Sequence, residues 1–198
     1  MSARPVAGSA RAAERSHAAH ARRRSLVVAL VASLVAAASA SCSLRTESGE
    51  FGELPDKASF IDNKVSLFME VRCGGLDCHG QVGRPLRIYG QTGLRLKARE
   101  DGLRDNSPTT DDERTENYRS VVGLEPEAMA ECFESKGEKF ATFQLLKKPL
   151  GVENDGIRHK GGPVLRPTQS DPGWQCLYGW VSDNVDAAEC ERASKITP

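Results

Sequence analysis

Signatures of the common enzyme classes are missing from this 198-residue sequence. It has no G-x-S-x-G nucleophile elbow, no H-E-x-x-H zinc pair, no G-x-x-x-x-G-K-S/T phosphate loop and no G-x-G-x-x-G dinucleotide fingerprint. Its length also excludes a large multidomain enzyme, since one domain usually takes about 100–200 residues. We therefore expect a protein that is not an enzyme.

An excess of positive charge is absent as well. The 27 Lys and Arg residues equal the 27 Asp and Glu residues in number. Six Arg and one Glu lie in the first 41 residues, which leaves 21 basic and 26 acidic residues, a net charge of −5, in residues 42–198. Binding to nucleic acid needs a basic surface that neutralises phosphates, so we expect no nucleic-acid partner.

The sequence also lacks an apolar run of about 20 residues, the length that spans a membrane. A shorter run at residues 26–38 follows three arginines at positions 22–24 and precedes the small residues Ser39, Ala40 and Ser41. This order of basic region, short apolar segment and small residues is typical of a secretory signal peptide. We predict a signal peptide over residues 1–41 and export to the periplasmic side of a bacterial membrane.

Cys42 directly follows these small residues, in an arrangement that resembles the lipobox of bacterial lipoproteins. The resemblance implies that a lipid on Cys42 anchors the protein to a membrane. Ordinary cleavage nearby and an uncleaved anchor are the alternatives. Residues 42–57 are polar and aperiodic, with Gly and Pro, and we expect them to form a flexible tether. The folded domain is expected over residues 58–198.

The segment VRCGGLDCHG contains Cys73, Cys78 and His79. Covalent haem attachment in c-type cytochromes uses two thiols that add to the porphyrin vinyl groups and a histidine that binds the iron, usually in the pattern C-x-x-C-H. The spacing here is C-x-x-x-x-C-H, two residues longer. Gly74 and Gly75 can take positive φ, which would let the extra length bulge outward while both sulfurs face one way. The segment therefore predicts one covalently attached haem c, with His79 as an iron ligand.

Three other arrangements of these residues remain open. In an oxidising compartment, Cys73 and Cys78 can form a disulfide. They can also bind zinc together with His159. Haem can finally be attached through a single thioether at Cys78.

Most of the domain is expected to be helical. Apolar residues recur at helical spacing from Phe60 to Val71, with Lys64 and Glu70 left for the outer face. Farther on, the side chains at positions 86, 88, 94 and 96 alternate around a turn at residues 90–93, which predicts a short β-hairpin or two extended segments.

Helix boundaries are also marked later in the chain. Thr110 and Glu113 fit a capping box that opens a helix. Pro126 suits the first turn of the next helix, which Gly137 ends. The last helices are expected to begin near residues 170–172. The predicted fold class is mainly α, with long loops.

Two further blocks follow the cysteine motif. Residues 93–103 read GLRLKAREDGL, and residues 145–181 contain a K-P-x-G run, a His followed by glycines, and a Trp-rich helix. In this order the three blocks closely resemble the planctomycete-type cytochrome c domain over residues 60–182. The segment around Cys73 is also similar to the R-C-G-x-L-D-C-H-G motif of lipoprotein variants of such domains in myxobacteria. The resemblance implies a cytochrome c-like helical domain that transfers electrons.

An electron-transfer haem needs a sixth iron ligand. His159 is the first candidate, because it is the one other histidine outside the signal peptide and lies in a Gly-rich loop. Met129 is the alternative axial ligand, and a Met/His pair would raise the reduction potential.

Cys176 and Cys190 lie 14 positions apart, across two expected helices and a turn. A disulfide between them would leave Cys132 unpaired. Pairing of Cys132 with Cys176 is the alternative, because connectivity does not follow from sequence.

Taken together, these patterns predict an exported, lipid-anchored monohaem c-type cytochrome-like protein that passes electrons to an unidentified redox partner. The alternative is a haem-free envelope lipoprotein, stabilised by disulfides, with a binding or structural role.

Overall fold

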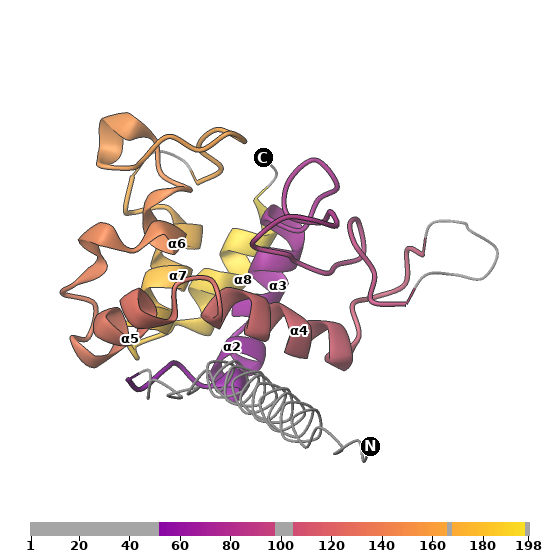
Figure 1. Cartoon of the computed structure of the whole chain (residues 1–198), viewed down its shortest axis with the longest axis horizontal. Helices are drawn as coiled ribbons and strands as arrows, with labels where there is room; N and C mark the ends of the chain where they lie inside the picture. The colour runs from indigo at the N-terminus through magenta and orange to yellow at the C-terminus, as the bar shows by residue number, and fades with distance from the viewer. Residues whose placement is uncertain (1–51, 98–104, 166–167, 197–198) are drawn as a thin grey trace, which may run out of the picture. The chain divides into compact units, whose positions relative to one another are not determined.

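Figure 1 shows the computed structural model, which describes residues 52–97, 105–165 and 168–196. These residues belong to one compact unit, residues 50–198. The predicted signal peptide, Cys42 and most of the predicted tether lie outside the described residues. Within the described ranges, no helix has both the length and the apolar character needed to span a bilayer.

The described part of the chain is mainly α-helical, as predicted. The expected β-hairpin is not formed, because the β pairing in these ranges is limited to one isolated bridge between Tyr89 and Leu94. The Gly90 N–H donates to the Leu94 carbonyl at 3.0 Å, so residues 89–94 form a tight loop instead of a ladder. Leu96, which the hairpin would have placed on the buried face, is 41% exposed.

Two short helices lead into the cysteine motif, α2 (Lys57–Asp62) and α3 (Val65–Arg72). The Asp56 carboxylate caps α2 by accepting a hydrogen bond from the Ser59 N–H at 2.8 Å. Lys64 separates the two helices by adopting a left-handed conformation with φ of 68°. The predicted apolar face is confirmed for four buried side chains, Phe60, Val65, Phe68 and Met69.

The expectation that Glu70 lies on the outer face is wrong. Its side chain is buried, accepts a hydrogen bond from the Ser66 hydroxyl at 2.7 Å and pairs with Arg114 at 3.3 Å. A buried carboxylate needs such partners. Helical periodicity placed Glu70 wrongly because it does not reveal Arg114, which reaches Glu70 from a distant helix.

The next two helices confirm the predicted N-terminal boundaries, whereas α5 ends at Glu134, three residues before the predicted stop at Gly137. α4 (Asp111–Val122) begins with the capping box of Thr110 and Glu113, in which each side chain bonds the other residue's backbone N–H. α5 (Pro126–Glu134) has Pro126 in its first turn. The chain turns away at Gly137, whose φ is 90°. Three short elements follow: η1 (Phe140–Thr142), α6 (Gln144–Lys147) and η2 (Val152–Asn154).

The C-terminal helices are α7 (Pro172–Val181) and α8 (Ala187–Lys195), capped by the carboxylates of Asp171 and Asp186. α8 packs against α7 and α3 (Figure 1). The predicted disulfide between Cys176 and Cys190 joins α7 to α8. Cys132 is a free, buried thiol, so the alternative pairing of Cys132 with Cys176 is wrong.

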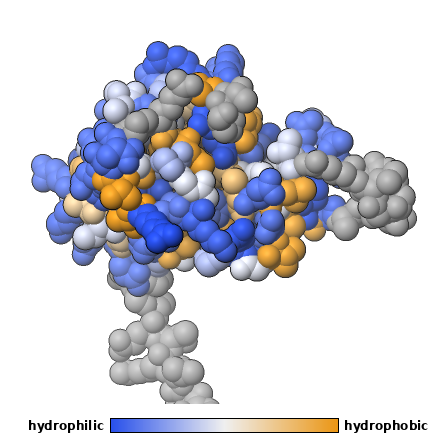
Figure 2. Space-filling model, turned by 90° about the horizontal axis from the view of Figure 1, so that it is seen from above, coloured by the Kyte–Doolittle hydropathy of each residue, from blue (hydrophilic) through white to orange (hydrophobic). Residues whose placement is uncertain are grey.

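The hydrophobic core lies among α2, α3, α5 and α7. Trp180 is its largest fully buried side chain and lies 4.9 Å from Phe60, measured between ring centroids. On the face seen in Figure 2, hydrophobic residues form separate patches between hydrophilic ones.

Candidate functional site

The cysteine motif forms a loop that begins where α3 ends. The N–H groups of Cys73 and Gly74 both donate to the Met69 carbonyl at 2.9 Å, which ends the helix. The His79 N–H then donates to the Cys73 carbonyl, also at 2.9 Å. This bond closes the loop, so the first cysteine and the histidine are held together despite the longer spacing.

Glycines make that closure possible by close packing. A Cβ on Gly74 would lie 2.6 Å from the Glu70 carbonyl oxygen, and a Cβ on Gly80 or Gly93 would lie 2.0 or 1.8 Å from the Gly74 carbonyl oxygen. Gly93 begins the GLRL block, so this block packs directly on the cysteine loop.

The conformational role expected of Gly74 and Gly75 is therefore wrong. Neither adopts positive φ. The extra length nevertheless extends outward, because Leu76 and Asp77 are exposed and a Cβ on Gly75 would meet nothing within 4 Å.

A cavity of about 310 Å³ lies beside this loop. This volume is at the lower end of the range for small-molecule sites, about 300–1,000 Å³. Its wall includes four of the residues singled out from the sequence, Cys73, Cys78, His79 and His159. Met129 is fully buried in the core and does not belong to this wall. The structure thus brings the motif and the distant histidine to one place.

Cys73 and Cys78 are both half-buried free thiols, so the structure does not contain the disulfide considered for them. Burial, with a smaller contribution from the neighbouring Cys78, raises the pKa of Cys73 to about 12 against the opposing charge of Arg72. Cys73 is therefore a protonated thiol at neutral pH.

The zinc arrangement finds no support in the geometry. Among the described residues, no three His, Cys, Asp or Glu side chains lie close enough together to hold a metal ion. A structural zinc site needs four such ligands.

The imidazoles of His79 and His159 lie close together in the wall of the cavity. Their rings are parallel to within 8°, and the ring centroids lie 5.9 Å apart. Two imidazoles that bind one metal from opposite sides, each through a bond of about 2 Å, would place their centroids roughly 6 Å apart. The observed centroid separation is of this size.

Both rings are also fixed in the same tautomer. Nδ1 of His79 lies 3.0 Å from the Leu86 carbonyl oxygen, and Nδ1 of His159 lies 3.1 Å from the Gly162 carbonyl oxygen. A carbonyl can only accept, so each Nδ1 donates its hydrogen. In the neutral ring this leaves Nε2 with a free lone pair, as metal-binding histidines require.

The surroundings of His79 favour that neutral form. Burial lowers its pKa below the ordinary value of 6.5, and the positive charges of Arg84 and Lys148 and the nearby His159 lower it further, against the hydrogen bond to Leu86. His79 is therefore uncharged at neutral pH and free to act as a ligand.

Arg72 connects the loop that follows His159 to the cysteine motif. Its side chain is buried, and its two Nη atoms donate to the carbonyls of Val164 and Ile196. The N–H of Leu165 also donates to the Pro149 carbonyl at 3.1 Å. These bonds hold the loop after His159 against the end of α3, where Cys73 begins.

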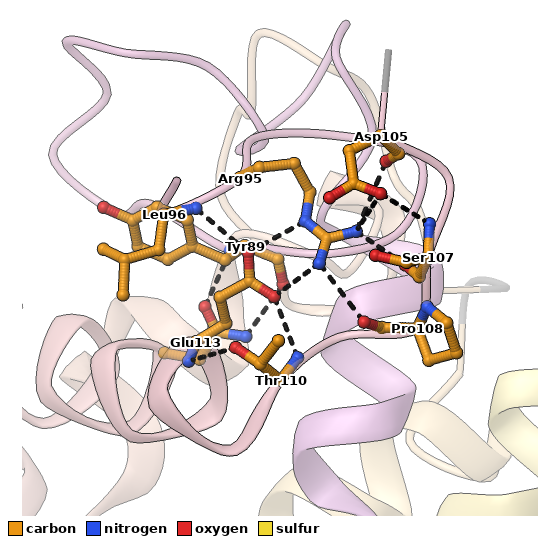
Figure 3. Close-up of polar contacts among 9 residues, drawn as sticks. Tyr89, Arg95, Leu96, Asp105, Ser107, Pro108, Thr110 and Glu113 are labelled. Atoms are coloured by element: carbon orange, nitrogen blue, oxygen red, sulfur yellow. Dashed lines mark hydrogen bonds and ion pairs between the residues drawn. The ribbon is translucent and has the colours of Figure 1, made fainter. Parts of the chain in front are cut away.

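The GLRL block is anchored by a buried ion pair (Figure 3). Arg95 donates to both oxygens of Glu113, from Nε at 2.8 Å and from Nη2 at 2.9 Å. The same guanidinium donates to the carbonyls of Ser107 and Pro108. This pair ties residues 93–96 to α4 and so holds Gly93 against the cysteine loop.

Sequence reasoning did not identify the positive charges around the cavity. Four cationic side chains line it, and Asp77 is the acidic one among the lining residues. The sequence did contain a signal for this positive charge, because each of the four cations lies within five residues of a motif residue. These cations are Arg72, Arg84, Lys148 and Lys160.

No protein-family model, curated protein or solved structure matches the chain in comparisons with known proteins. The resemblance to cytochrome c domains therefore depends on the three sequence blocks alone.

Proposed function

We propose that the chain is an exported, lipid-anchored monohaem c-type cytochrome-like protein that exchanges electrons with a redox partner protein. The observation that carries this proposal is the pair of parallel imidazoles, His79 and His159, with both Nδ1 atoms bonded to carbonyls and the rings 5.9 Å apart. Two free thiols, Cys73 and Cys78, line the same cavity.

The donor set fits a haem better than a bare metal ion. A porphyrin would bring its own nitrogen ligands to the iron, so the protein would need to add few donors, and His79 and His159 would supply them. The thiols of Cys73 and Cys78 would each add across one vinyl double bond, with the thiol hydrogen going to the other vinyl carbon and no leaving group. Haem bound in this way supplies a reversible one-electron change at its iron.

The chain's own part in this function is to hold and tune that group. Carbonyls of Leu86 and Gly162 fix the two imidazoles in the tautomer that binds metal. With His159 in place of Met129 as the second axial ligand, we expect a lower reduction potential than that of a Met/His cytochrome.

Haem attachment is tested by producing the full chain in a bacterial host that matures c-type cytochromes, followed by intact mass and a reduced-minus-oxidised spectrum. We expect the mass of one haem and a sharp reduced α-band. Cys78→Ala and Cys73→Ala should each lose a thioether, whereas Cys132→Ala, which removes a thiol outside the cavity wall, should keep both. A colourless protein whose mass lacks four hydrogens, two for the Cys176–Cys190 disulfide and two for a bond between Cys73 and Cys78, would overturn the proposal.

Axial ligation is tested separately. His159→Ala should retain the covalently attached mass but lose the low-spin spectrum, because the thioethers do not involve this residue. Arg158→Ala, which changes an exposed neighbour outside the cavity wall, should keep both the mass and the spectrum. A low-spin spectrum that survives in His159→Ala would show that another residue is the second ligand.

A further inference from the structure

Arg84 lines the cavity without a partner of its own. Its Nε is buried and has no hydrogen-bond acceptor. In the described part of the chain, no hydrogen bond or ion pair is made by its guanidinium, including any to Asp77 in the same wall. A buried polar atom such as this Nε normally has a hydrogen-bond partner, so its lack of one calls for an explanation.

Arg72 offers an instructive comparison. It lines the same cavity, and its Nε also lacks an acceptor, but its two Nη atoms donate to the carbonyls of Val164 and Ile196. Arg72 therefore has a structural role that explains its burial. Arg84 has no such role in the described residues.

The charge around Arg84 is positive, because Arg72, Lys148 and Lys160 line the same cavity. Asp77 is exposed and offsets one of these charges at most. A half-buried cation among other cations costs free energy unless an anion is bound there.

We propose that Arg84, assisted by Lys148, binds a carboxylate of the group that is held between His79 and His159. This inference rests on the proposed function, because it takes the ligand to be a porphyrin that carries free carboxylates. A planar guanidinium is the side chain best suited to a carboxylate, which it can bind through two hydrogen bonds. Arg84 thereby makes the site specific for the free acid over an ester.

The test separates this contact from covalent attachment. In a full chain carrying Cys73→Ala and Cys78→Ala, haemin and its dimethyl ester are titrated, and binding is followed by the Soret band. We expect the ester to bind about tenfold or more weakly, the effect of one charge-assisted hydrogen bond. Adding Arg84→Gln should weaken the binding of haemin by a similar factor and leave the binding of the ester unchanged.

The matched control is Arg87→Gln, because Arg87 is exposed, lies three residues away and does not line the cavity. It should leave both affinities unchanged, and circular dichroism of each variant checks the fold. Equal binding of haemin and ester, or equal loss of both in Arg84→Gln, would overturn the inference. A folded variant that binds neither porphyrin would also overturn this inference, whereas the proposed function itself is overturned by a colourless full chain that retains both cysteines.

Discussion

The ion pair between Arg95 and Glu113 allows a quantitative prediction about how the cysteine loop is held. The Glu113 side chain is 3% exposed, and four donors reach its two oxygens. Oε1 accepts from Arg95 Nε and from the Leu96 N–H, at 2.8 and 2.9 Å. Oε2 accepts from Arg95 Nη2 and from the Thr110 N–H, both at 2.9 Å.

Glu113→Gln removes the charge and replaces one oxygen with an NH₂ group. Whichever way the amide lies, two of the four donors then face a donor instead of an acceptor. Breaking one side of a buried ion pair costs about 3–5 kcal/mol. We take about 3 kcal/mol, because the carbonyls of Ser107 and Pro108 still accept from Arg95.

The assay is urea or thermal unfolding, followed by circular dichroism. A loss of about 3 kcal/mol should lower the melting temperature by about 6–12 °C for a domain of this size. The control is Glu116→Gln on the same helix, whose partner Arg119 is two-thirds exposed, so that its loss should cost less than about 1 kcal/mol. Equal effects of the two substitutions would refute the assignment of Glu113 as the anchor.

The same carboxylate gives the prediction its pH dependence. Burial alone would raise the pKa of Glu113, but the hydrogen bonds from Arg95, Thr110 and Leu96 together hold it below the ordinary value of 4.5. A lowered pKa in the folded state means that the unfolded chain binds the proton more readily, so the stabilisation is present above pH 4.5 and is lost as the pH falls through the folded-state pKa. The stability difference between the native chain and Glu113→Gln should therefore shrink in acid.

Three further predictions concern the loop, the disulfide and the histidine. Gly74→Ala should destabilise the fold by about 1–3 kcal/mol, since its Cβ would meet a backbone oxygen at 2.6 Å, whereas Gly75→Ala should have little effect in the same unfolding assay. Cys176→Ser should cost about 3 kcal/mol, the stabilisation expected for a loop of this length, and an unchanged urea midpoint would contradict it. Because burial lowers the pKa of His79, the haem-free chain should lose stability as the pH falls below 6.5, and His79→Gln should remove that part of the pH dependence.

Local sequence signals predicted the parts of the fold that depend on local interactions. The capping box at Thr110, the proline at the start of α5 and the disulfide between α7 and α8 are confirmed. Each of these features is formed by residues at one end of a helix or in two helices that follow each other in the chain. The predicted apolar face from Phe60 to Val71 is confirmed as far as Met69 for the same reason, but Val71 is 48% exposed, so its assignment to that face is wrong.

The errors arose where a distant segment determines the outcome. Glu70 is buried because Arg114, 44 positions away, pairs with it. The expected hairpin is replaced by a loop because residues 93–96 are pulled towards α4 by Arg95 and Glu113. Neither partner is visible in the periodicity of the segment itself.

In the candidate site, too, the sequence predicted the local features and missed those that depend on distant segments. Sequence spacing identified Cys73, Cys78 and His79 as a group, and the scarcity of histidine selected His159. The hydrogen bonds that fix both imidazole tautomers come from the backbone carbonyls of Leu86 and Gly162, which carry no side-chain signature. The positive wall likewise depends on how four separate segments fold together.

The longer cysteine spacing is best understood through the backbone that closes it. The hydrogen bond from the His79 N–H to the Cys73 carbonyl holds the ends of the motif together, although four residues separate the two cysteines. The additional length is accommodated outside, where Leu76 is 47% exposed. Gly80 and Gly93 pack directly against the Gly74 carbonyl, because neither carries a Cβ, and the loop is therefore compact on its inner side. A motif two residues longer than C-x-x-C-H can therefore bring the same three side chains to one cavity, provided that the GLRL block supplies Gly93.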